Sequence, residues 1–192
     1  MFSVKMFFNT DSFFNNTNYS YSYLSEYTLS KKQSLEWIKM LATKTPCKVI
    51  NMKVFHMYGE NDSPSKFIPY LIDTISREEI FIDMTPGLQK RDFIYVNDVV
   101  SAFETVLKNE LKLTSYQEYE VGSGFCFSII HLAELIKKIS NSKTELNFGA
   151  LPYREGEIME TVCNNKKLIE LGWISKFSLN VGLSKIIKNF NK

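Results

Sequence analysis

The sequence predicts an α/β protein with a largely parallel sheet, and three observations indicate this class. Short apolar runs, such as residues 4–8 and 48–55, have the length and composition of buried strands. Between such runs lie segments such as residues 25–43, whose apolar positions repeat with helical spacing. Strands and helices alternate along the chain, which is typical of parallel strands joined by crossover helices.

The first elements are expected to be a strand, a loop and a helix. The strand at 4–8 stops at a turn-forming cluster, residues 9–12 (NTDS), and the polar residues 15–22 form a loop. The helix over 25–43 ends before Pro46. Its apolar face is expected to hold Tyr27, Leu35, Trp37, Ile38 and Leu41.

The later elements continue the alternation. After the strand at 48–55, further strands are expected over 80–83, 92–96, 119–121 and 145–148. Helices are expected over 66–75, 97–108, 128–139, 165–171 and 181–189. Asn97 and Ser128 stand at the start of two of these helices and have side chains suited to an N-cap.

Composition excludes several classes of protein. Of the 192 residues, 44% are hydrophobic and 23% are charged, as in ordinary soluble domains. The net charge is only +2, and lysine and glutamate are interspersed, so no nucleic-acid partner is expected. No segment has the roughly 20 apolar residues of a membrane span, and no signal peptide is recognised, so we expect a cytoplasmic protein without membrane insertion.

Cysteine and histidine give no metal or disulfide pattern. The three cysteines, Cys47, Cys126 and Cys163, are far apart, and the two histidines, His56 and His131, are isolated. We therefore expect no metal site and a reducing compartment.

Tyr27 and Lys31 form a YxxxK pattern that suits proton transfer. Four residues apart on a helix, the two side chains lie on one face. An adjacent ammonium favours the phenolate, so the tyrosine can exchange a proton with a carbonyl or hydroxyl. Thr10 stands at the end of the preceding strand. Because ligands of parallel sheets bind beyond the carboxyl ends of the strands, Thr10 can meet Tyr27 there.

This order of strand end, hydroxyl and Tyr–Lys pair resembles the extended, sugar-nucleotide-modifying branch of the short-chain dehydrogenase/reductase superfamily, the NAD-dependent epimerase/dehydratase family. Later segments match the family's motifs in order, namely 55–59 (FHMYG), 66–69 (KFIP), 91–96 (RDFIYV), 122–124 (GSG), 154–157 (REGE) and 171–173 (LGW). The resemblance covers nearly all of the chain, but it corresponds to the later part of an intact family member.

The resemblance implies a partial doubly wound, Rossmann-like sheet, its later half, with a small C-terminal α/β part that binds substrate. Residues 1–59 are expected to be the remainder of the Rossmann-like domain. Residues 60–192 are expected to form mainly the nucleotide-sugar-binding part, with some segments returning to the first sheet.

Within the family, residues 8–14, 61–70 and 157–165 are most similar to a nucleotide-sugar 4-keto reductase that uses NADPH on a CDP-linked sugar in O-antigen biosynthesis. The resemblance thus implies the catalytic and substrate-binding portion of such an enzyme. Ser12 stands where the dehydratases of the family have a Glu, which favours reductase or epimerase over dehydratase. A nucleotide-sugar 4-epimerase and a non-catalytic remnant stay open as alternatives.

The resemblance also implies roles for individual residues. Tyr27 donates a proton at the sugar C4, Lys31 supports it and binds the nicotinamide ribose, and Thr10 holds the keto oxygen. The nucleotide sugar is expected to contact His56, Lys66, Phe67, Arg91, Arg154 and Glu157. Guanidinium groups are suited to the diphosphate because they fork onto phosphate oxygens.

The cofactor is expected to be NADP or NAD, although no GxGxxG or GxxGxxG turn occurs in the sequence. Residues 122–124 lack the third glycine and are expected to be a strand-to-helix turn. Without a pyrophosphate cradle, the isolated chain is expected to reduce no 4-keto sugar at a measurable rate. Family members commonly dimerise through the YxxxK helix, so a homodimer is possible, with Trp37 and Leu41 exposed in the monomer.

Overall fold

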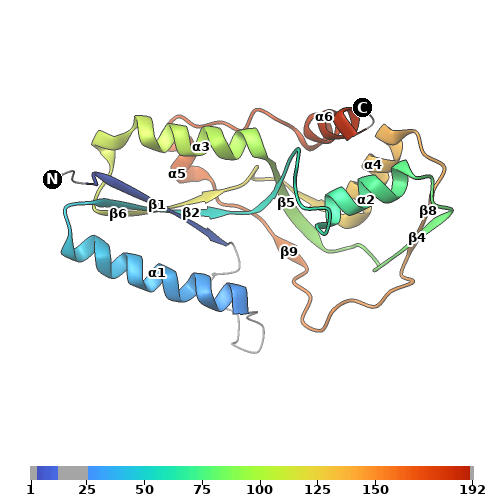
Figure 1. Ribbon diagram of the computed structural model, residues 1–192, viewed down its shortest axis with the longest axis horizontal. Coiled ribbons are helices and arrows are strands. Elements are labelled where there is room, and N and C mark those ends of the chain that lie inside the picture. Colours follow the sequence, from blue (N-terminus) through green and yellow to red (C-terminus); the bar gives the residue numbers. More distant parts are fainter. Residues whose placement is uncertain (1–3, 13–25, 191–192) are drawn as a thin grey trace. The chain divides into compact units, whose positions relative to one another are not determined.

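The computed structural model describes residues 4–12 and 26–190, and these form two compact units (Figure 1). Within the described residues, unit 1 holds the chain up to Phe55 together with Val99–Gly122 and Cys163–Ile174. Unit 2 holds His56–Asp98, Ser123–Val162 and the residues from Ser175 on. Each unit is thus built from segments far apart in the sequence. The loop expected over 15–22 lies outside the described residues.

Unit 1 contains a parallel sheet with helices on both faces. Its strands are β1 (Met6–Ser12), β2 (Lys48–Val54) and β6 (Tyr116–Val121), in the order β1-β2-β6. Helix α1 (Glu26–Lys44) covers one face, and α3 (Val96–Lys108), which belongs to unit 1 from Val99 on, covers the other (Figure 1). A short 3-10 helix (Glu110–Lys112) and α5 (Lys166–Glu170) complete the unit. The expected α/β class with parallel pairing is confirmed.

The expected turn at residues 9–12 is wrong, because β1 continues through it. Asn9 pairs with Asn51 and Ser12 with Val54, so the parallel ladder supplies backbone partners along the whole cluster. The polar side chains also find partners within the sheet. Asn9 donates to the Asn51 amide oxygen over 2.7 Å.

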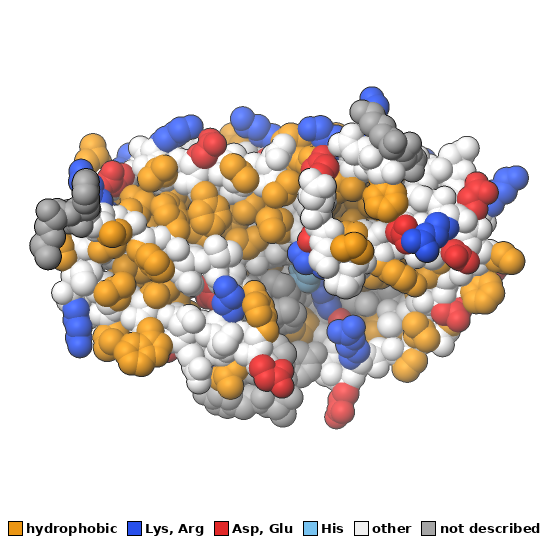
Figure 2. Space-filling view, in the orientation of Figure 1, with side chains coloured by type: hydrophobic (Ala, Val, Ile, Leu, Met, Phe, Trp, Pro, Cys, Tyr) orange, Lys and Arg blue, Asp and Glu red, His pale blue; other side chains and the backbone are white. Residues whose placement is uncertain are grey.

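The expected apolar face of α1 is only partly correct. Thr28, Leu35 and Ala42, at successive intervals of seven, are its buried residues. Tyr27 and Trp37 are instead 60% and 69% exposed. Figure 2 shows hydrophobic side chains at the surface of unit 1, and the exposed ones include Trp37 on α1 and Leu107 on α3. The helix therefore packs along a narrow stripe and leaves large apolar side chains uncovered.

Unit 2 combines a small mixed sheet with a two-stranded one. The first holds β3 (His56–Tyr58), β5 (Lys90–Tyr95), β7 (Cys126–Ser128) and β9 (Glu160–Thr161), with β7 antiparallel to β5. The second pairs β4 (Phe81–Met84) with β8 (Glu145–Phe148). The helices of the unit are α2 (Phe67–Ser76), α4 (Ile129–Ser140) and α6 (Leu179–Phe190).

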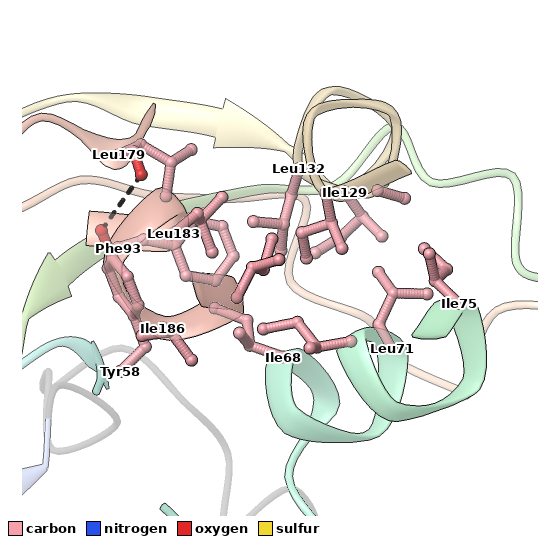
Figure 3. Packing of buried hydrophobic residues seen from close by; sticks show 14 of the residues in the cluster. Tyr58, Ile68, Leu71, Ile75, Phe93, Ile129, Leu132, Leu179, Leu183 and Ile186 are labelled. Carbon is pink, nitrogen blue, oxygen red and sulfur yellow. Dashed lines mark hydrogen bonds between the residues drawn. The ribbon is translucent and has the colours of Figure 1, made fainter. Parts of the chain in front are cut away.

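The core of unit 2 lies between its three helices and β5. Leu71 of α2, Leu132 of α4 and Leu183 of α6 are fully buried in one cluster (Figure 3). Tyr58 reaches into the same cluster, where its hydroxyl lies 3.4 Å from the Leu179 carbonyl oxygen. This core holds the short strands, which have few hydrogen bonds of their own, in fixed positions.

The structure shows whether the two expected N-cap residues, Ser128 and Asn97, and the expected turn at 122–124 are placed as the sequence indicates. Ser128 caps α4 as expected, since its hydroxyl accepts from the His131 amide over 3.1 Å. Asn97 does not precede α3, because that helix begins at Val96 directly after β5. The turn at 122–124 is held by the Asp92 carboxylate, which accepts from the amides of Ser123 and Gly124. It leads first into β7, a strand that was not expected, and then into α4.

Among residues 4–12 and 26–190, no helix is long and apolar enough to cross a membrane.

Candidate active site

The Tyr–Lys pair of α1 lies at the end of β1 in unit 1. The Lys31 ammonium donates to the Thr10 carbonyl oxygen over 2.9 Å and lies 5.7 Å from the centre of the Tyr27 ring. Tyr27 is 60% exposed, and Thr10 is exposed as well. The structure thus places the Lys31 ammonium between the Thr10 backbone and the Tyr27 ring, and Tyr27 is largely exposed.

Beside them, the sheet face opposite α3 carries a polar network. The Asn51 amide nitrogen donates to Asp11 over 3.1 Å and to Glu118 over 2.8 Å, and the Lys53 ammonium pairs with Glu118 at 2.7 Å. Burial alone would raise the pKa of Glu118, but the hydrogen bonds from Lys53 and Asn51 outweigh it and hold this pKa below its usual value. The network therefore keeps Glu118 ionised and orients the buried Asp11 carboxylate.

Unit 2 contains a separate cavity of about 430 Å³. One part of its lining is apolar and aromatic, from Phe67, Tyr70, Leu71, Ile82, Met84, Phe93, Ile129 and Leu151. The other part is polar or charged, from His56, Asp83, Thr85, Gln89, Arg91, Arg154 and Glu157. A mainly apolar wall with a few polar groups is the usual make-up of a small-molecule site.

Two arginines and a glutamate form the charged part of this cavity. The Arg91 guanidinium is hydrogen-bonded to the Glu157 carboxylate, and the two side chains are 11% and 20% exposed. Arg154 and Glu157 flank a turn in which the Glu157 amide donates to the Arg154 carbonyl over 3.1 Å. Gly156 makes this turn possible by adopting φ +69°. The glutamate pairs with Arg91, so Arg154 is the guanidinium of the lining that is left for an anion.

His56 lies on β3, with its ring centre 5.7 Å from that of Phe93. Burial and, second, the positive charge of Arg91 lower its pKa from 6.5 to about 4. His56 is therefore neutral at pH 7 and presents hydrogen-bonding groups to the cavity without adding charge.

Lys66 is not among the residues that line the cavity. It stands at the N-cap of α2, and its ammonium pairs with Asp62 at 2.7 Å. Conversely, Asp83 and Gln89 line the cavity and were not expected there. Gln89 lies two residues before Arg91, and alternation along an extended chain places both on one side, a signal that could have identified it.

Comparison with known proteins places these features in a family. Residues 6–122, more than half of the chain, match the model of the NAD dependent epimerase/dehydratase family. The chain belongs to this family. The membership expected from the order of the motifs is thereby confirmed.

Two relatives within the family are CDP-abequose synthases. The one from Salmonella muenchen is 40% identical over 186 residues, and the one from Salmonella typhimurium is 35% identical over 189 residues. These matches cover 96% and 97% of the chain, but only 62% and 63% of the relatives. The chain thus spans less than two thirds of the length of these proteins.

Solved structures of epimerase/dehydratase type share the fold. Thermotoga maritima UDP-glucose 4-epimerase with UDP-glucose superposes with a TM-score of 0.81, at 22% identity, over 98% of this chain and 64% of that one. Pseudomonas aeruginosa RMD with NADPH gives 0.83, at 19% identity, over 96% and 66%. The expected Rossmann-like class is therefore confirmed, and the relatives are NAD(P)-dependent enzymes of nucleotide sugars.

The described residues fit part of the cofactor that this family uses. Tyr27 and Lys31 present an exposed phenol and an ammonium side by side, which suits the hydroxyls of a nicotinamide ribose. The sequence contains no glycine-rich turn for a pyrophosphate. The residues present therefore suit the nicotinamide end of the cofactor and not its pyrophosphate.

Proposed function

We propose that this chain is the catalytic and substrate-binding portion of a nucleotide-sugar 4-keto reductase like CDP-abequose synthase. Such an enzyme reduces the 4-keto group of a CDP-linked 3,6-dideoxy sugar for O-antigen biosynthesis. The observation that carries the proposal is the grouping of Thr10, Tyr27 and Lys31 in a chain 40% identical to a CDP-abequose synthase.

In this proposal the three grouped residues act on the keto oxygen. The Tyr27 phenol donates a proton to the oxygen at C4, and the Thr10 hydroxyl holds the same oxygen by a hydrogen bond. The Lys31 ammonium stabilises the phenolate that remains, and its bond to the Thr10 carbonyl keeps it at the strand end. NADPH or NADH, when bound, supplies the hydride for C4.

The nucleotide part of the substrate is assigned to unit 2. Arg91 and Arg154 are proposed to bind the diphosphate, with Glu157 on the ribose hydroxyls and His56 near the sugar or diphosphate. Phe67 is proposed to pack against the nucleotide, and Lys66 to approach it from the start of α2. The cavity with both guanidinium groups in its lining supports these assignments.

The functional division is proposed to follow the chain as expected, with the Tyr–Lys chemistry in residues 1–59 and mainly nucleotide-sugar binding in 60–192. Ser12 in place of a second carboxylate favours reduction over water elimination. A complete active site is proposed to need the glycine-rich turn that the sequence lacks.

The test is a chimera in which the region of the Salmonella muenchen relative that precedes the match is joined to this chain. We expect it to consume one NADPH for each CDP-4-keto-3,6-dideoxyglucose reduced, as followed by absorbance and by NMR of the product. Tyr27→Phe should lower the rate by about 100-fold or more, since it removes the proton donor. Ser34→Ala, at an exposed position farther along the same helix, serves as the matched control.

The other outcomes identify the alternatives. Retained NAD and interconversion of C4 epimers without net NADPH consumption would identify a 4-epimerase. A folded chimera that neither binds CDP nor oxidises NADPH would identify a remnant. The 192-residue chain alone is expected to give no measurable turnover.

A further inference from the structure

The cavity of unit 2 presents two acceptor oxygens for which the described residues provide no donor. One is a carboxylate oxygen of Asp83 and the other is the amide oxygen of Gln89. Both residues line the cavity together with the two arginines. Because a guanidinium binds phosphate oxygens, the arginines account for a diphosphate and leave these acceptors for another part of the ligand.

Asp83 is held in a defined orientation. It lies on β4, and Asn147, its register partner on β8, donates to its Oδ1 over 3.0 Å. Asp83 is an exposed residue of the cavity lining, and because an ionised carboxylate only accepts hydrogen bonds, its Oδ2 remains available as an acceptor. Within the described chain, no ion pair involving Asp83 is formed, so its charge also disfavours a ligand oxygen at that point.

Gln89 supplies the second acceptor. The residue is only 8% exposed, and its amide nitrogen donates to the Thr85 hydroxyl over 3.2 Å. Its Oε1 is buried without a hydrogen-bond partner among the described residues. A buried acceptor of this kind destabilises the protein until a ligand donates to it.

We propose that Asp83 and Gln89 select the exocyclic amine of cytosine and so discriminate CDP-linked from UDP-linked sugars. A cytosine amine has two hydrogens, one for each acceptor, and no oxygen at C4. Uracil has a single ring N–H and an O4 that would face the Asp83 carboxylate. This inference rests on the proposed function, because the nucleotide site itself is part of that proposal.

The experiment is isothermal titration of the 192-residue chain with CDP and with UDP as probes. We expect CDP to bind at least about tenfold more tightly than UDP. In Asp83→Asn, Asn147 still donates to the side-chain oxygen, so an NH₂ group replaces the free acceptor. We expect this variant to bind CDP more weakly and UDP equally or more tightly, which lowers the preference by about tenfold.

Two further variants separate base selection from general damage. Gln89→Leu removes the other acceptor and should weaken CDP more than UDP. Asp73→Asn, an acid-to-amide change on the surface of α2 where Asp73 pairs with Arg77, should leave both affinities unchanged. Circular dichroism verifies that each variant is folded.

Different outcomes contradict the base selection and the nucleotide site of the proposed function. Equal affinity of the unsubstituted chain for CDP and UDP, or an unchanged ratio in Asp83→Asn, overturns the base selection and leaves the nucleotide site in place. Failure of a folded chain to bind either nucleotide overturns the proposed site, and the base selection with it.

Discussion

His56 illustrates how a single buried side chain links this fold to pH. Its pKa is lowered to about 4 by burial and by Arg91, whereas in an unfolded chain it is about 6.5. Between these values the unfolded state binds a proton that the folded state does not. The contribution of His56 to the free energy of unfolding is therefore complete above pH 6.5. It is lost as the pH falls towards 4.

We accordingly expect His56→Gln to flatten the pH dependence of stability. Its free energy of unfolding should lose less between pH 7 and pH 4 than that of the unsubstituted chain, by up to about 3 kcal/mol. Urea titrations at several pH values measure this. His131→Gln, at an exposed histidine, is the control and should keep the original slope. Equal slopes for the unsubstituted chain and His56→Gln would contradict the assignment.

Some residues that line the cavity lie in family motifs, and others do not. Arg91, Arg154 and Glu157 stand in recognisable motifs, and all three line one cavity. Asp83 lies in no such motif and reaches the same cavity through the pairing of β4 with β8. That pairing joins residues 64 positions apart, which periodicity within one strand does not reveal.

At the scale of elements, local chemistry predicts helix starts where a side chain provides the cap. Ser128 was recognised because its hydroxyl accepts a first-turn amide. The helix α3 has no such cap residue before it and follows β5 directly. Its buried Asp98 instead accepts from the amides of Lys176 and Phe177, far along the chain. A start of that kind depends on distant residues and was misplaced.

Ser128→Ala should destabilise the protein by about 1 kcal/mol, because the His131 amide loses its acceptor at the start of α4. Ser128→Asp keeps an acceptor there and should retain most of the stability. Denaturant titration compares the two variants with the unsubstituted chain. An equal loss in both would show that the Ser128 side chain acts through something other than the cap.

At the scale of the whole molecule, the exposed apolar residues of α1 bear on assembly. Trp37 and Leu41 are 69% and 39% exposed on that helix. An exposed apolar patch on a helix is a common feature of subunit interfaces. The homodimer that the family resemblance makes possible would cover these residues.

Sedimentation equilibrium tests this expectation. We expect the unsubstituted chain to be a dimer and the double variant Trp37→Glu, Leu41→Glu to be a monomer, because two buried carboxylates would face the interface. Leu107→Glu, on α3, is the matched control and should leave the mass unchanged. A dimer that survives the double substitution would place the interface elsewhere.

Fold class, family and the Tyr27–Lys31 pair could be recognised without coordinates, because they depend on periodicity, motif order and a four-residue spacing along one helix. The path of β1 through residues 9–12, the exposure of Tyr27 and the presence of Asp83 in the cavity could not. Each depends on which partner strand or helix lies alongside, and such pairings join residues far apart in the chain. Only the folded arrangement determines them.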